Sequence, residues 1–280
     1  MLTGPRIFAC NTLRMLHVIL PTDFSHTSFK AMQFAVDVFG TEGVRYTLLN
    51  TYLKQAYRNA LVPVHLDTAR RSRNGLLRMK RGLRRHAPGA QVALRSTFEQ
   101  LANAINRLHG KQPADYVVMG AQGQGNYGRV GRNTGMVVTG SRVPVITVPA
   151  EWEPAPLLRI VFGDDSGALE RQTLRPMVRL AKWAKARVEV VHVRKKDQPD
   201  DRAERRVMLG TWLHDLPHGF SLLTGNDITA TVDRFVAGQK AQLVVLVHRQ
   251  KGFWERLFKA STSKRMAMYT SVPLLVLQET

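Results

Sequence analysis

The sequence predicts an α/β fold built from two tandem domains, each a doubly wound parallel sheet. Three observations support this prediction. Apolar runs alternate with helical patterns along the chain, the same order of elements occurs twice, and a proline-rich segment, Pro149–Leu157 (PAEWEPAPL), separates the two series. Strands rich in Val, Ile and Leu on both faces are typical of parallel sheets that helices cover on both sides. Right-handed crossovers then give a doubly wound sheet.

The first copy begins with an apolar strand that ends in an acidic turn, Leu16–Ser25 (LHVILPTDFS). The next segment, His26–Phe39, has apolar residues at helical spacing, and a second strand follows at Arg45–Tyr52. A later strand, Ala114–Gly120 (ADYVVMG), leads into a glycine-rich stretch, and Ser141–Pro149 (SRVPVITVP) closes the copy. Since ligands of doubly wound sheets bind beyond the carboxyl ends of the strands, these strand ends are candidate binding segments.

The second copy repeats this order. An apolar strand with an acidic turn, Leu158–Gly167 (LRIVFGDDSG), precedes a helical pattern at Ala168–Ala186 and a strand at Arg187–Val193. The later strands are Ala241–Val247 (AQLVVLV) and Thr270–Gln278 (TSVPLLVLQ). Because the whole order of strands and helices recurs, the sequence indicates two copies of one structural unit.

The repeat sets the expected domain boundaries. We expect an N-terminal extension over residues 1–14, a first domain over 15–150, a linker over 151–157 and a second domain over 158–280. The linker is predicted from its prolines and its lack of periodicity.

The strand at Ala114–Gly120 ends in the first of five glycines, at positions 120, 123, 125, 128 and 131 of the stretch VVMGAQGQGNYGRVGRNT. Glycines between a strand and a helix let the backbone approach an anion and present N–H groups to it. The stretch therefore suits a phosphate. A turn with positive φ at several glycines would use the same residues, and neither a Walker lysine pattern nor dinucleotide-fingerprint spacing is present.

PTDFS after the first strand, VMGAQG after the later strand and the closing VPVITVP strand together resemble the universal stress protein family, from Leu16 to Leu277. The resemblance implies a five-stranded parallel sheet with helices on both faces in each domain. It also implies a pseudo-dimer in which the two closing strands pair edge to edge. For function, it implies a stress-response regulatory protein whose first domain binds ATP or another adenine nucleotide, with or without Mg²⁺.

The resemblance assigns nucleotide contacts to the ends of the first, second and fourth strands and to the glycine stretch. ATP-binding members carry G-x2-G-x9-G-(S/T) there. Gly120 and Gly123 supply the first two glycines, but the third falls on Asn133, or on Gly131 followed by Arg132 if the loop is two residues short. The expected nucleotide-binding residues are Pro21, Thr22, Asp23, Thr51, Met119, Gly120, Gln122, Gly123, Gly131, Arg132, Asn133 and Thr134.

The second copy keeps the strand-end aspartate, as Asp164, but has VHRQKG (Val247–Gly252) where the first has GAQGQG. We expect that it has lost the phosphate cradle, and that Arg249 and its neighbours His248 and Lys251 lie in a solvated loop, the alternative being direct contact with an anion. Asp165 and Ser166 are interpreted as a cap of the following helix.

Charge is the outlying feature of the composition. Forty-one basic residues against 21 acidic ones give a net charge of +20, which attracts anions. The densest segment, Ala69–His86, is predicted to be an amphipathic helix with a basic outer face. That face is either merely solvated, in an arginine-rich chain, or it contacts nucleic acid. The footprint of such a contact would be Arg70, Arg71, Arg73, Arg81, Arg84 and Arg85.

No constellation of residues predicts catalysis or a metal site. The nine histidines lack metal-ligand spacing, and His17, His192 and His248 are interpreted as structural residues of strands. We therefore expect a protein that is not an enzyme, with at most slow, incidental ATP hydrolysis. No apolar run approaches the ~20 residues of a membrane helix. The N-terminal segment lacks the features of a secretory signal, and the single cysteine, Cys10, fits a reducing cytoplasm. A cytoplasmic protein is expected, and a homodimer remains open.

Overall fold

The computed structural model describes residues 15–52, 64–122, 132–194, 202–249 and 272–279. The strands in this part of the chain are β1 (Leu16–Pro21), β2 (Val44–Thr51), β3 (Gln91–Thr97), β4 (Tyr116–Gly120), β5 (Val145–Val148), β6 (Arg159–Gly163), β7 (Arg187–Arg194), β8 (His218–Thr224), β9 (Leu243–His248) and β10 (Leu274–Gln278). The helices are α1 (His26–Phe39), α2 (Val64–His86), α3 (Leu101–Lys111), α4 (Arg132–Gly140), α5 (Arg171–Ala184), α6 (Ala203–Trp212) and α7 (Ile228–Gln239).

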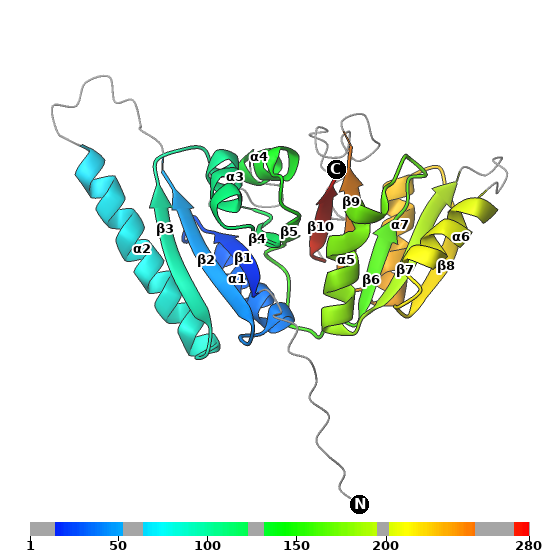
Figure 1. Ribbon diagram of the computed structural model, residues 1–280, viewed down its shortest axis with the longest axis horizontal. Helices are drawn as coiled ribbons and strands as arrows, with labels where there is room; N and C mark the ends of the chain where they lie inside the picture. Colours follow the sequence, from blue (N-terminus) through cyan, green and yellow to red (C-terminus); the bar gives the residue numbers. More distant parts are fainter. Residues whose placement is uncertain (1–14, 53–63, 123–131, 195–201, 250–271, 280) are drawn as a thin grey trace, which may run out of the picture.

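The strands form one ten-stranded sheet in the order β3-β2-β1-β4-β5-β10-β9-β6-β7-β8 (Figure 1). Neighbouring strands within each group of five run parallel, as predicted. The order reverses between β1 and β4 in the first half and between β6 and β9 in the second half. These two reversals are the switch points at which an open α/β sheet offers a crevice to ligands.

Helices cover both faces of the sheet because the strands are apolar on both faces. One buried cluster joins α1, α2, α5 and α6 to one face, for example through the ring of Phe39 in α1, whose centroid lies 5.0 Å from that of Tyr116 in β4. A second cluster joins α3, α4 and α7 to the other face, through residues such as Ile105 and Val232. Among the described helices, none is both long and apolar enough to cross a membrane.

The two halves meet at the centre of the sheet, where β5 and β10 pair antiparallel with Ile146 opposite Leu275. The expected pairing of the closing strands is therefore confirmed. Contacts outside the sheet reinforce the junction. The Tyr116 hydroxyl donates to the carbonyl of Pro176 at 2.6 Å, and Arg179 pairs with Asp115 at 2.7 Å. The halves thus share one continuous sheet, and both hydrophobic clusters contain residues of the two halves.

Candidate functional site

The first candidate site lies at the carboxyl ends of β1 and β4, at the switch point of the first half. Thr22 directly follows β1, but its hydroxyl is buried and engaged by protein atoms. It lies 2.9 Å from the hydroxyl of Ser28 in α1, and it accepts a hydrogen bond from the backbone N–H of Phe24 at 2.9 Å. Thr22 therefore shapes the turn between β1 and α1, and its side chain is not presented to a ligand.

Asp23 is the exposed member of this turn. One carboxylate oxygen accepts the backbone N–H of Ser25 at 3.0 Å, which fixes the side chain at the end of β1. Ser25 in turn caps α1, because its side chain accepts the N–H of Ser28. The carboxylate is thus held at the carboxyl end of β1 by a local turn. Thr51, which ends β2 nearby, is partly exposed.

A buried polar chain that the sequence analysis missed supports the same edge of the sheet. The Asn50 amide donates to the carbonyl of Thr22 at 2.7 Å, and the Ser72 hydroxyl of α2 donates to Asn50 at 2.7 Å. Ser72 also lies 2.6 Å from the hydroxyl of Ser96 in β3. Asn50, an amide side chain directly after the apolar pair Leu48 and Leu49 of β2, is the signal that could have predicted this chain.

Gly120 ends β4 and needs to be glycine for a reason inside the fold. A Cβ at this position would lie 2.9 Å from the side chain of Thr27 and 3.2 Å from its backbone carbon. The first turn of α1 therefore packs directly on the end of β4. The glycine is explained by helix packing, in addition to any room that it leaves for a ligand.

The start of α4 is tied to the same point. The buried hydroxyl of Thr134 donates to the carbonyl of Gly120 at 3.1 Å, so the N-terminal turn of α4 lies next to the end of β4. The first N–H groups of a helix have no partner within the helix and attract anions. Asn133 in this turn is exposed. Gly123, Gly131 and the side chain of Arg132 lie outside the described residues.

Three more of the predicted nucleotide-binding residues are buried within the protein. Pro21 and Met119 are buried in the strands. Gln122 is 8% exposed, and its side-chain oxygen accepts the backbone N–H of Ala150, just beyond β5, at 3.1 Å. Gln122 therefore turns away from β1 and fixes the segment that follows β5.

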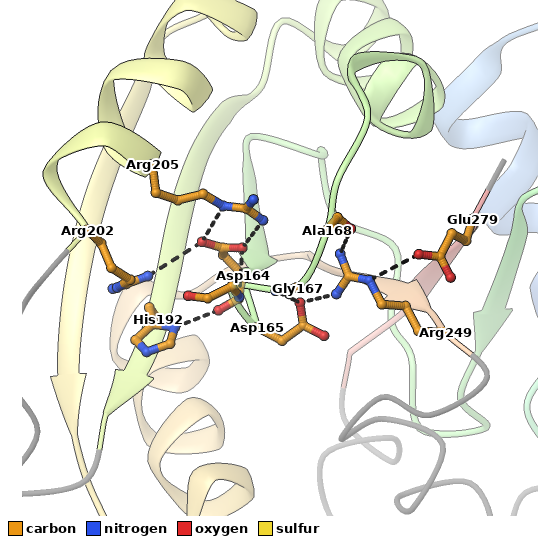
Figure 2. A network of polar contacts seen from close by, with 10 residues as sticks. Asp164, Asp165, Gly167, Ala168, His192, Arg202, Arg205, Arg249 and Glu279 are labelled. Atoms are coloured by element: carbon orange, nitrogen blue, oxygen red, sulfur yellow. Dashed lines mark hydrogen bonds and ion pairs between the residues drawn. The ribbon is translucent and has the colours of Figure 1, made fainter.

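The equivalent position of the second half is occupied by the protein's own charges (Figure 2). The side chain of Asp164 is only 2% exposed. It is paired with two arginines at the start of α6, Arg205 at 2.7 Å and Arg202 at 3.4 Å. It also accepts the N–H of Ser166 at 3.2 Å, which matches the bond between Ser25 and Asp23. The cavity that remains beside Asp164 is about 10 Å³, enough for about one water molecule.

Arg249 closes the second crevice from the other side. It follows β9, and its guanidinium pairs with Asp165 and donates to the carbonyl of Ala168 at 2.6 Å. The side chain is 11% exposed and covers Gly167, where a Cβ would lie 2.7 Å from the Arg249 Nη1. The expectation of a solvated loop is therefore wrong for Arg249, because its charge is neutralised by a carboxylate 84 residues away in the sequence.

The interpretation of Asp165 and Ser166 as a helix cap is also wrong. α5 begins only at Arg171, and its N-cap residue is Glu170, which makes no side-chain capping bond. Asp165 instead accepts the N–H of Gly167 at 3.1 Å and pairs with Arg249. The acidic pair after β6 thus builds a closed turn.

The strand histidines have structural surroundings. His17 is buried, with its Nε2 2.9 Å from the hydroxyl of Thr47, and burial together with the charge of Arg45 lowers its pKa. His192 has its Nδ1 2.8 Å from the carbonyl of Asp164. Within the described ranges, no group of three His, Cys, Asp or Glu residues is arranged to hold a metal ion.

Comparison with known proteins gives one family and several similar folds. Residues 15–149 match the model of the universal stress protein family. A universal stress protein from Archaeoglobus fulgidus DSM 4304 superposes with a TM-score of 0.71 at 16% identity, over 95% of this chain and 97% of that one. A functionally unknown protein from Pseudomonas aeruginosa PAO1 gives a TM-score of 0.58 at 14% identity, over 96% and 94% of the two chains. No curated protein matched the sequence.

Proposed function

Residues 15–149 match the universal stress protein family, and we propose that this half of the chain binds an adenine nucleotide at the carboxyl ends of β1 and β4. In this proposal the protein is a stress-response component that senses the nucleotide without strong catalysis. ATP is the proposed ligand, with Mg²⁺ accompanying its phosphates.

One observation carries the proposal. At the switch point of the first half, the exposed carboxylate of Asp23 and the first turn of α4 lie at the ends of the adjacent strands β1 and β4. A carboxylate accepts hydrogen bonds from ribose hydroxyls, and a helix N-terminus attracts phosphate. The two ends of a nucleotide therefore find matching chemistry across one crevice.

The second half supports the proposal by contrast. Asp164 holds the position of Asp23, but its carboxylate is taken by Arg202 and Arg205. A ribose would have to displace a buried ion pair to reach it, which costs several kcal/mol. We therefore propose that nucleotide binding is confined to the first half.

Calorimetric titration of ATP and ADP into the full chain tests this function. We expect binding that the Asp23→Asn variant weakens about tenfold or more, because hydrogen bonds to a charged group contribute ~1.5–3 kcal/mol each. The matched control is Glu42→Gln, which removes the same charge at an exposed position just before β2, at the opposite edge of the sheet. If neither nucleotide binds the wild-type chain or raises its melting temperature, the proposal is wrong.

A further inference from the structure

Helix α2 presents a strongly basic surface to solvent. Its residues Leu76, Met79 and Leu83 are buried against the sheet. From Thr68 to His86 the helix contains no acidic residue. The exposed arginines are Arg70, Arg71, Arg73, Arg78, Arg81, Arg84 and Arg85. At 100° per residue they span the half of the helix opposite to the buried side chains.

This charge is concentrated on one side of the molecule. The helices on the face of α2, namely α1, α2, α5 and α6, carry 15 Lys or Arg and 3 Asp or Glu. The helices on the other face carry 4 and 1. On α5 and α6 several charges are neutralised, as in the pairs of Arg179, Lys182 and Arg205 with aspartates. Within the described part of the chain, no carboxylate pairs with an arginine of α2.

A groove of about 590 Å³ runs along this basic surface. Phe24 and Leu77 supply its apolar side chains, and Leu77 is 41% exposed. Arg71, Arg78 and Arg81 also line it. The ring of Phe24 lies directly against α2 at Gly75, where a Cβ would be 2.5 Å from the ring. The groove thus combines an aromatic ring, an aliphatic side chain and guanidinium groups.

We propose that this surface, α2 with its groove, binds single-stranded nucleic acid. Arginine forks form paired hydrogen bonds with phosphate oxygens, and binding sites for single strands combine a basic track with aromatic side chains that contact the bases. From Arg70 to Arg85 the helix extends about 22 Å, at 1.5 Å per residue. This length is enough to lie along several consecutive phosphates of a single strand.

The structure disfavours an acidic membrane as the occupant. A helix that lies in a membrane surface inserts an apolar face, whereas the apolar side of α2 is already buried in the hydrophobic core. Among the described side chains of α2, Leu77 is the one large apolar side chain that is exposed. The inference is independent of the adenine-nucleotide site, since it rests on α2 and not on Asp23.

Fluorescence anisotropy with a labelled 12-nucleotide single strand of mixed sequence tests the inference. We expect binding by the full chain that weakens about fifty-fold between 50 and 200 mM salt if four phosphates are contacted. A duplex of the same sequence and a polyglutamate chain should compete less well than unlabelled single strand. Absence of binding at 50 mM salt would overturn the inference, and so would a competitor that matches the single strand.

Two double variants locate the surface. Arg78→Gln with Arg81→Gln should weaken binding at least tenfold and reduce the salt dependence. Arg171→Gln with Arg175→Gln removes two exposed arginines from α5, on the same face of the sheet, and should leave the affinity within about twofold. Equal losses in the two variants would show that only the overall charge matters and would refute a site on α2.

Leu77→Ala should weaken binding of the single strand, and unchanged affinity would refute base contact in the groove. Circular dichroism checks the fold of each variant, and Asp23→Asn should bind the oligonucleotide like the wild type.

Discussion

Asp23 and Asp164 follow equivalent strands and make the same local bond, yet they have different surroundings. Each accepts the N–H of the serine two residues later, at 3.0 and 3.2 Å. Asp23 remains exposed at the first crevice, whereas the side chain of Asp164 is buried by Arg202 and Arg205. The difference between a candidate ligand site and a closed site therefore comes from α6 and not from the aspartate.

Asp164→Asn should lower the stability of the protein markedly. Removing the carboxylate leaves two arginines without their buried partner, and breaking a buried ion pair costs about 3–5 kcal/mol. Urea unfolding of the full chain measures the effect. The control is Asp215→Asn, which breaks the exposed pair of Asp215 with Lys182 and should change stability much less. Equal shifts of the two unfolding midpoints would contradict the structural role of Asp164.

The pairing of Arg249 with Asp165 could not be predicted from the sequence. Near Arg249 the chain reads as a polar segment, and nothing local indicates a partner 84 residues away. The place of Asp23 in a turn after β1 was predictable, because the sequence pattern indicates an apolar strand that ends in an acidic turn. Thr22 and Gln122 were assigned to the ligand, but they hydrogen-bond within the protein because strand ends also need partners for turns and neighbouring backbone.

At the scale of elements, α1 and α4 meet at the end of β4. Gly120 lets the first turn of α1 approach, and Thr134 ties α4 to the carbonyl of Gly120. The bounds of α1 agree with the sequence prediction at both ends, because Ser25 caps its start and Gly40 has a positive φ of 73° at its end. The start of α5 was predicted three residues early, since the turn after β6 continues to Glu170 without a side-chain cap.

Gly120→Ala should destabilise the protein by about 1–3 kcal/mol, the usual cost of overpacking a close contact, because the added methyl group meets the backbone of Thr27. Gly110→Ala in α3 is the matched control. A Cβ there has no neighbour within 4 Å, and alanine favours a helix, so stability should rise by up to ~1 kcal/mol. Thermal unfolding of both variants measures the effects, and a neutral Gly120→Ala would show that α1 does not pack closely on β4.

At the scale of the whole molecule, two similar halves form one sheet but have different crevices. The repeat and the α/β fold were predictable from the alternation of elements and from its recurrence along the chain. The structure repeats even single bonds, since the carbonyls of Pro144 and Pro273 accept equivalent hydrogen bonds from the N–H groups of Val117 and Val244. The pairing of β5 with β10 followed from the family resemblance alone. The apolar pattern of an edge strand does not specify its partner.

Native mass spectrometry of the full chain in excess ATP tests the central claim most directly, namely that one half binds a nucleotide and the other half is closed by its own arginines. The predicted result is one nucleotide per chain in the wild type and in Glu42→Gln, with loss of the bound species in Asp23→Asn. Two nucleotides per chain, or one that persists in Asp23→Asn, would contradict the claim.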